Sequence, residues 1–224
     1  METRNLAKGL HQVFLSKLIN VIAAILTIIG LFVMIGGMAV GTAAVLEADS
    51  LEAAGAVMGM AGTGVVVGSI LSIVGAVLLI VALILMLVGL GNAGKDDARF
   101  KTVLLFALIS LACSIISSFV GTVPYLPQIL KIVATVLDLL VVIFTIQYAS
   151  DDLEKIGRSE LAEFGKKILM VILIIVIVDL IVTILPMFMV ALATVLSIIA
   201  LVLQIVYWFA FMIFLAKASR AFAS

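Results

Sequence analysis

Six continuous apolar runs, each of about 20 residues or longer, constrain this chain more than any other feature of its sequence. The runs cover residues 18–44, 64–91, 102–121, 127–149, 168–185 and 187–216. A helix of roughly 20 apolar residues crosses the roughly 30 Å hydrocarbon core of a bilayer. The runs show no alternation of period two, which favours helices over the strands of a membrane barrel. We therefore expect an all-α integral membrane protein with six transmembrane helices.

The composition agrees with solvation by lipid. Hydrophobic residues make up 66% of the 224 positions and charged residues only 12%, whereas soluble domains are roughly 45–50% apolar. The net charge is zero, so nothing indicates a nucleic-acid partner. We expect the lipid bilayer as the main partner, together with a second copy of the chain or a partner membrane subunit.

The basic residues predict an orientation in the membrane. With six spans, twelve of the thirteen Lys and Arg residues fall on one side, and only Lys131 lies toward the other. The positive-inside rule places that basic side in the cytoplasm. Both termini are then cytoplasmic, as an even number of spans also requires, and we expect a multi-pass protein of the plasma membrane.

The six spans are expected to form three helical hairpins within one membrane domain, residues 1–224. The hairpins cover 1–95, 96–155 and 156–224. Each begins with a Phe followed closely by Lys, at Phe14, Phe100 and Phe164. Parallel repeats of this kind occur in transporters. Phe and Lys are also common anchors at the membrane interface, so the sequence leaves both interpretations open.

The first hairpin is expected to extend beyond the membrane. Asp49-Ser50-Leu51-Glu52 resembles a capping box, with Asp49 as N-cap and Glu52 at N3. It predicts a helix that starts near residue 50 and continues into the second span. At about 1.5 Å per residue, residues 50–91 would be about 60 Å long, roughly twice the hydrocarbon thickness. The hairpin therefore protrudes outside the membrane or bends back into it.

Residues 151–166 (DDLEKIGRSELAEFGK) are predicted to form a short amphipathic helix. Leu153, Ile156, Leu161 and Phe164 recur near helical spacing, with polar neighbours between them. This pattern is typical of a helix that lies on the membrane surface.

A row of small residues marks the second span. Gly64, Gly68, Ser72 and Ala76 recur at every fourth position. Small residues at this spacing let two helix backbones approach closely in lipid. We expect this row to pack against another helix, with the first span as the nearest candidate.

The residue inventory argues against an enzyme. His11 is the only histidine and Cys113 the only cysteine, so no Ser/His or Cys/His site and no zinc set can be built from separate spans. Residues 89–95 (GLGNAGK) match the first seven positions of a P-loop, but Asp96 follows where Ser or Thr is required, after a membrane helix rather than a strand. We interpret the match as a coincidence, and expect no cofactor and no metal.

Two aspartates inside apolar runs are the sharpest functional clue. Asp138 and Asp179 each lie about 11 residues from the cytoplasmic end of their span, roughly 16 Å into the membrane. A carboxylate in hydrocarbon is costly and therefore marks a candidate functional site. Gln204 and Ser114 are expected at nearly the same depth, and Lys131 lies on the same helical face as Asp138.

Two functions remain open for this polar layer. One is a small channel or transporter that conducts or couples to a cation or proton through the aspartate pair. The other is a non-enzymatic scaffold or accessory subunit in which the layer only packs helices. If the two carboxylates face each other in a dry bundle, they cannot both be ionised cheaply. A shared proton is then expected rather than an ion pair with Lys131, which is about 10 Å from Asp138 along the helix.

Overall fold

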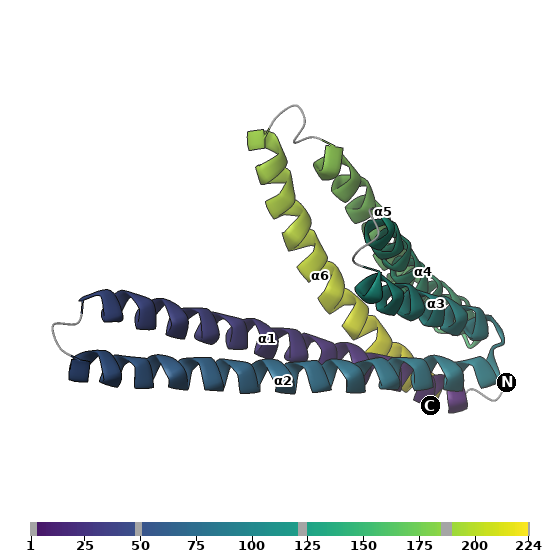
Figure 1. The fold of residues 1–224 in the computed structure, drawn as a ribbon. Coiled ribbons are helices and arrows are strands. Elements are labelled where there is room, and N and C mark those ends of the chain that lie inside the picture. The colour runs from purple at the N-terminus through teal and green to yellow at the C-terminus, as the bar shows by residue number, and fades with distance from the viewer. Residues whose placement is uncertain (1–3, 48–50, 121–124, 185–189, 224) are drawn as a thin grey trace. The chain divides into compact units, whose positions relative to one another are not determined.

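A computed structural model describes the backbone of residues 4–47, 51–120, 125–184 and 190–223. Side chains are described in these ranges except at 40–61, 128, 177–198, 200 and 201. Within the described residues, all regular structure is α-helical (Figure 1). The six helices are α1 (Arg4–Glu47), α2 (Leu51–Asp96), α3 (Arg99–Phe119), α4 (Leu126–Lys155), α5 (Ser159–Ile184) and α6 (Val190–Ala223).

The predicted all-α fold class is confirmed, and the helices have the character of membrane spans. Five stretches in the described part of the chain are long and apolar enough to cross a bilayer: Arg4–Ala39, Gly62–Asp96, Arg99–Phe119, Ile129–Lys155 and Val202–Ala223. At most 28% of the most apolar window of any of them is buried within the protein. Large apolar side chains such as Phe32 and Ile73 are instead more than half exposed. Such a surface indicates that lipid surrounds these helices, because soluble monomers rarely expose large contiguous apolar patches.

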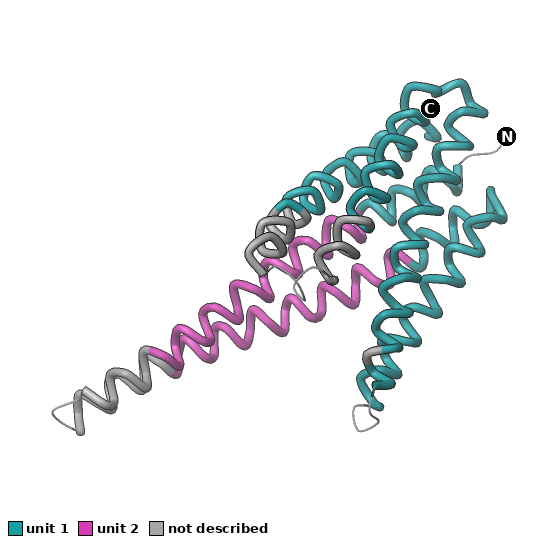
Figure 2. Tube along the Cα trace, turned by 90° about the horizontal axis from the view of Figure 1, so that it is seen from above, with its two compact units in different colours: residues 1–14, 87–224 teal, residues 15–86 magenta. Residues whose placement is uncertain are grey.

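The chain divides into two compact units, coloured separately in Figure 2. Unit 1 contains residues 1–14 and 87–224, and unit 2 contains residues 15–86. The long helices α1 and α2 each pass from one unit into the other. The predicted N-cap of α2, Asp49, lies outside the described residues.

In unit 2, α1 and α2 approach each other so closely that glycine is required. A Cβ atom added to Gly68 would lie 2.5 Å from the carbonyl oxygen of Gly30 and 2.7 Å from the backbone nitrogen of Met34. A Cβ on Gly30 would lie 2.7 Å from the carbonyl oxygen of Gly68. A Cβ on Gly64 would lie 3.1 Å from the Cα of Gly37. Both helix backbones are therefore in direct contact, with almost no side chain between them.

The contact follows a seven-residue repeat rather than the predicted four-residue row. Ala76 is exposed, whereas Gly75 is buried and faces Ala23 and Thr27 of α1. Steps of four residues turn about 40° around a helix, so three such steps leave the contact face. Steps of seven drift only about 20° and stay on one face of two helices that wind around each other. The buried repeat in α2 is accordingly Gly68, Gly75 and Ala82, and Ser72 completes the contact beside Gly30.

In unit 1, the end of α2 contacts the beginning of α1 through closely packed glycines and through hydrogen bonds to Asp96. A Cβ on Gly9 would lie 2.5 Å from the carbonyl oxygen of Gly89. Asp96 accepts hydrogen bonds from the Asn5 side chain at 2.8 Å and from the Leu6 backbone N–H at 2.7 Å. A carboxylate suits the first turn of α1, where N–H groups lack helical partners. Residues 89–95 are helical, so they do not form the loop that phosphate binding needs.

The helices α3 to α6 pack against their neighbours in chain order within unit 1. Pro127 lies in the first turn of α4, as its sequence position predicts. The residue before α4, Tyr125, has a positive φ of 64°.

The predicted surface helix over residues 151–166 is wrong, because the chain turns in its middle. The helix α4 continues to Lys155, and α5 begins at Ser159. Gly157 has a positive φ of 77°, and its N–H donates to the carbonyl of Glu154 while the Arg158 N–H donates to that of Leu153. These two bonds form a Schellman motif, which ends a helix at a left-handed glycine. Apolar spacing continues across such a turn and therefore does not reveal it.

Candidate functional site

Antiparallel packing of α3 and α4 sets which predicted polar residues meet. Phe100 lies against Tyr148 with ring centroids 5.9 Å apart, and Phe106 against Phe144 at 5.8 Å. Phe144 also stacks on Tyr148 at 5.5 Å. Residue numbers therefore rise along α3 as they fall along the adjacent stretch of α4, as in any antiparallel pair. In this register Asp138 meets residue 110 of α3.

Asp138 and Ser110 make a polar contact in the middle of these two apolar helices. The Ser110 hydroxyl donates to Oδ1 of Asp138 at 2.6 Å and lies 3.1 Å from the carbonyl oxygen of Ala134. Ser110 is buried, but Asp138 remains exposed. Among the described residues, no group makes a hydrogen bond or an ion pair with Oδ2 of Asp138. One carboxylate oxygen is therefore paired, the other has no hydrogen-bond partner among the described residues, and the side chain as a whole is exposed.

The other candidate residues lie apart from this contact. Ser114 is exposed one turn further along α3, where its carbonyl accepts from Ser117 and Ser118. Lys131 is also exposed, and its carbonyl accepts from Thr135. The helix α5 includes Asp179, whose side chain lies outside the described residues. The predicted aspartate pair is therefore untested.

Gln204 lines a pocket between α4, α5 and α6 that does not include Asp138. The pocket has a volume of about 420 Å³. Its polar groups come from Thr135, Gln204, Tyr207 and Trp208, and apolar side chains such as Leu139 and Ile172 complete the walls. Thr135 of α4 therefore lines this pocket, whereas Asp138, three residues further along α4, bonds to Ser110 of α3.

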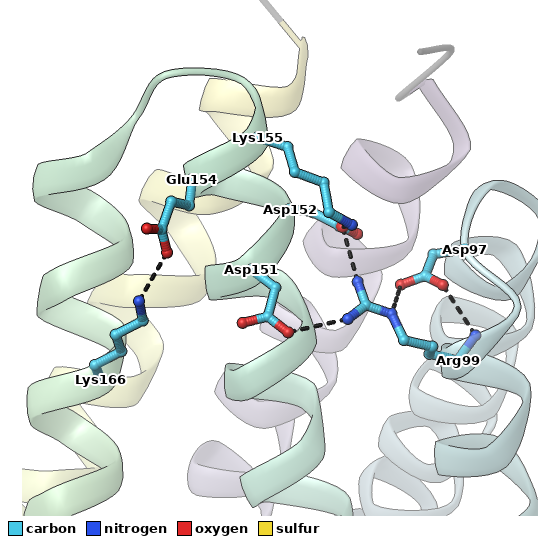
Figure 3. A network of polar contacts seen from close by, with 7 residues as sticks. All are labelled: Asp97, Arg99, Asp151, Asp152, Glu154, Lys155 and Lys166. Carbon is cyan, nitrogen blue, oxygen red and sulfur yellow. Dashed lines mark hydrogen bonds and ion pairs between the residues drawn. The ribbon is translucent and has the colours of Figure 1, made fainter.

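A second polar cluster lies where α3 begins and α4 ends (Figure 3). The guanidinium of Arg99 binds three carboxylates: Asp97 at 2.8 Å, Asp151 at 3.0 Å and Asp152 at 2.8 Å. It also lies over the ring of Tyr148, 4.8 Å from the centroid. Asp97 additionally accepts the backbone N–H of Arg99 at 3.0 Å. One arginine therefore fixes the beginning of α3 to the end of α4.

Asp152 is the most buried member of this cluster. Its side chain is only 1% exposed, and Oδ1 accepts from both Arg99 and Lys155, the latter at 2.6 Å. Its Oδ2 is buried without a hydrogen-bond partner among the described residues. A buried carboxylate is tolerated when cations neutralise it. The exposed pair of Glu154 and Lys166, at 2.7 Å, links α4 to α5 nearby.

The Arg99 cluster was not foreseen from the sequence. The sequence places Arg99 among the twelve basic residues on the predicted cytoplasmic side, next to Phe100 at the start of the second hairpin. A usable signal exists in the sequence: an Asp-x-Arg at the start of one helix and an Asp-Asp pair at the end of the next, joined by a tight hairpin. Consecutive helices are usually neighbours, so opposite charges at the start of one and the end of the next meet when the two pack antiparallel.

Among the described residues, no group of three or more His, Cys, Asp or Glu side chains is arranged to hold a metal ion. Cys113 is half-buried in α3 as a free thiol.

No family model, curated protein or solved structure matches this chain. The apolar helices indicate a membrane protein.

Proposed function

We propose that the chain is a multi-pass protein of the plasma membrane with six spans and both termini in the cytoplasm. Five apolar helices and the twelve-to-one distribution of basic residues support this topology. The remaining span is the fifth along the chain, residues 168–185, and α5 (Ser159–Ile184) contains all but the last of these residues. Reporter fusions at Ser224 and near Asp49 are expected to report opposite sides of the membrane. Reports from the same side would contradict the topology.

Within that topology, we propose proton- or cation-coupled transport with Asp138 as the ionisable group. The observation that carries the proposal is the half-paired carboxylate of Asp138 in mid-helix. A carboxylate at membrane depth is costly unless a proton, a cation or water satisfies it. Its exposed side chain leaves room for each of these.

Ser110 supports the proposal because its hydroxyl has two acceptors within reach. A hydroxyl has one proton, so it donates to either Asp138 or the carbonyl of Ala134. It can donate to Asp138 while the carboxylate is charged. When Asp138 holds a proton, Ser110 can turn to Ala134 and accept from the carboxyl group. The contact therefore accommodates both protonation states.

Flux measurements in proteoliposomes test this proposal. The wild type is expected to move protons or a common monovalent cation down an imposed gradient. Asp138→Asn should fold normally and lose at least about tenfold in flux, because an amide neither titrates nor attracts a cation. Glu154→Gln is the matched control, since it makes the same acid-to-amide change in the same helix at an exposed position. Equal flux through wild type and Asp138→Asn would contradict the proposal.

Asp179 and Ser110 refine the test. Asp179→Asn should also abolish flux if the two aspartates share one site. Ser110→Ala should retain part of the flux and change its pH dependence, because the carboxylate remains but loses its hydroxyl donor.

The second candidate is a non-enzymatic scaffold or accessory subunit. The Ser110–Asp138 hydrogen bond favours it, because polar contacts between helices are ordinary packing interactions in lipid. In this case an Asn at position 138 still accepts from Ser110 and preserves stability. Absence of flux of any common cation through the wild type, together with a folded Asp138→Asn protein, would favour the scaffold. Its partner would then be a second copy or another membrane subunit.

A further inference from the structure

A surface pocket with an excess of positive charge lies at the junction of α4, α5 and α6. Its volume is about 860 Å³. The turn after α4 contributes Gly157 and Arg158, the first turns of α5 contribute Glu160 and Phe164, and the end of α6 contributes Lys217 and Arg220. Three basic side chains and one acidic side chain line the pocket, so its net charge is +2.

The basic residues of this pocket differ from those around it. Arg99, Lys155, Lys166 and Lys167 each make an ion pair with a carboxylate. Arg158, Lys217 and Arg220 make no ion pair with any described residue, and all three are exposed. Lys217 lies over the ring of Phe164, with its ammonium 6.0 Å from the centroid. A cation–π contact orients the ammonium without neutralising it, so the positive charge is available to a ligand.

In the proposed six-span topology, the pocket lies at the depth of lipid headgroups. It lies beyond the apolar runs 168–185 and 187–216, at the ends of the two helices that contain them. Basic side chains at the cytoplasmic ends of membrane helices attract anionic lipids, by about 1 kcal/mol for each Lys or Arg. Basic pockets between helices bind phosphate-bearing headgroups in the same way.

We propose that this pocket binds the phosphate headgroup of an anionic membrane phospholipid. Arg158 and Arg220 bind the phosphate oxygens in forked hydrogen bonds, and Lys217 supplies the third positive charge. Glu160 repels the anion and limits its affinity. The inference rests on the proposed six-span topology and does not depend on transport through Asp138.

Native mass spectrometry of the full chain in mild detergent tests the proposal, with equal amounts of phosphatidylglycerol and phosphatidylcholine as probes. The wild type is expected to retain phosphatidylglycerol in preference. The double variant Arg158→Gln/Arg220→Gln should weaken that binding at least about tenfold. The control Lys166→Gln/Lys167→Gln removes the same amount of charge from ion-paired, exposed residues of α5, and it should change binding little.

Three outcomes would overturn the proposal. An equal loss in the two double variants would indicate general charge attraction instead of a site. Equal retention of both lipids by the wild type would indicate no headgroup recognition. Displacement of the lipid by glycerol 3-phosphate at the same concentration would indicate a site for free phosphate anions.

Glu160→Gln keeps the test decisive if the double variant fails to fold. Loss of this carboxylate raises the net charge of the pocket and should tighten phosphatidylglycerol binding severalfold. An improvement cannot result from unfolding. Unchanged or weaker binding by a folded Glu160→Gln protein would contradict the proposed role of the pocket.

Discussion

Two apolar helices are held together in opposite ways in the α1–α2 contact of unit 2 and in the α3–α4 contact of unit 1. Gly30, Gly68 and Gly75 remove side chains from the first contact, so backbone meets backbone. The second contact is filled by aromatic rings such as Phe106 and Phe144, and Arg99 closes its end. Neither contact gains from hydrophobic burial in the usual sense, because lipid is as apolar as the side chains.

The difference determines how each contact responds to substitution. A backbone contact gains van der Waals attraction along its whole length, but it has no space for an added atom. A side-chain contact tolerates smaller residues at a modest cost, because neighbouring rotamers adjust. We therefore expect the glycine contact to fail abruptly and the aromatic contact to weaken gradually.

The largest expected effect is that of Gly68→Leu. A Cβ at this position already lies too close to Gly30 and Met34, so a leucine must force the backbones apart and destabilise the protein by about 3 kcal/mol or more. Unfolding in mixed detergent micelles measures the change. The control is Gly36→Ala, where an added Cβ meets nothing within 4 Å. That change should raise stability by up to about 1 kcal/mol, since alanine is the better helix former.

If Gly68→Leu leaves stability and oligomeric size unchanged, α1 and α2 are not held together by this face. That result would mean that close backbone contact at the glycines does not stabilise the α1–α2 pair.

Arg99→Gln is expected to have the next largest effect. It removes three ion pairs and leaves the buried Asp152 with Lys155 alone. Loss of one partner of a buried carboxylate costs about 2–3 kcal/mol when the second cation remains. Thermal unfolding in detergent provides the measurement, with Lys167→Gln as an exposed ion-pair control. Equal stability of the two variants would mean that the Arg99 cluster does not fix α3 to α4.

Phe144→Leu should have a smaller effect, because it keeps an apolar side chain while removing the stacking on Tyr148 and Phe106. Aromatic pairs contribute about 0.5–1.5 kcal/mol beyond area burial, so a loss of about 1 kcal/mol is expected. The same unfolding assay measures it. A loss as large as that from Gly68→Leu would contradict the contrast between abrupt and gradual failure.

The smallest effect should come from Glu163, outside the proposed span of α5. Its hydrogen bond with Lys167 lowers the pKa of Glu163 below the ordinary 4.5. A lowered pKa means that this pair stabilises the fold above pH 4.5 and that the contribution disappears as the pH falls through the folded value. Both side chains are largely exposed, so Glu163→Gln should barely change the melting temperature at pH 7. A shift as large as that of Arg99→Gln would contradict this ranking.

The sequence by itself determined the class of this protein. Long apolar runs leave helices in lipid as the only stable arrangement, because backbone polar groups must be satisfied within each segment. The same reasoning identified Asp138 as a costly residue and the small residues of the second span as a packing face. Each of these conclusions depends on local composition and length, which the chain shows directly.

The tertiary structure decided which residues meet. Ser110 lies against Asp138 and Ser114 does not. This depends on the register in which α3 packs on α4, with Phe100 edge-to-face against Tyr148, and estimates of depth from the sequence do not resolve that register to one helical turn. Gly75, and not the predicted Ala76, belongs to the buried repeat of α2. Two helices that wind around each other keep residues at a spacing of seven in contact. Arg99 meets Asp152 across 53 positions of sequence, a contact that exists only once both helices have packed. The local sequence pattern determines where each helix lies along the chain and which residues it contains. Packing between two helices determines which face of each helix meets the other.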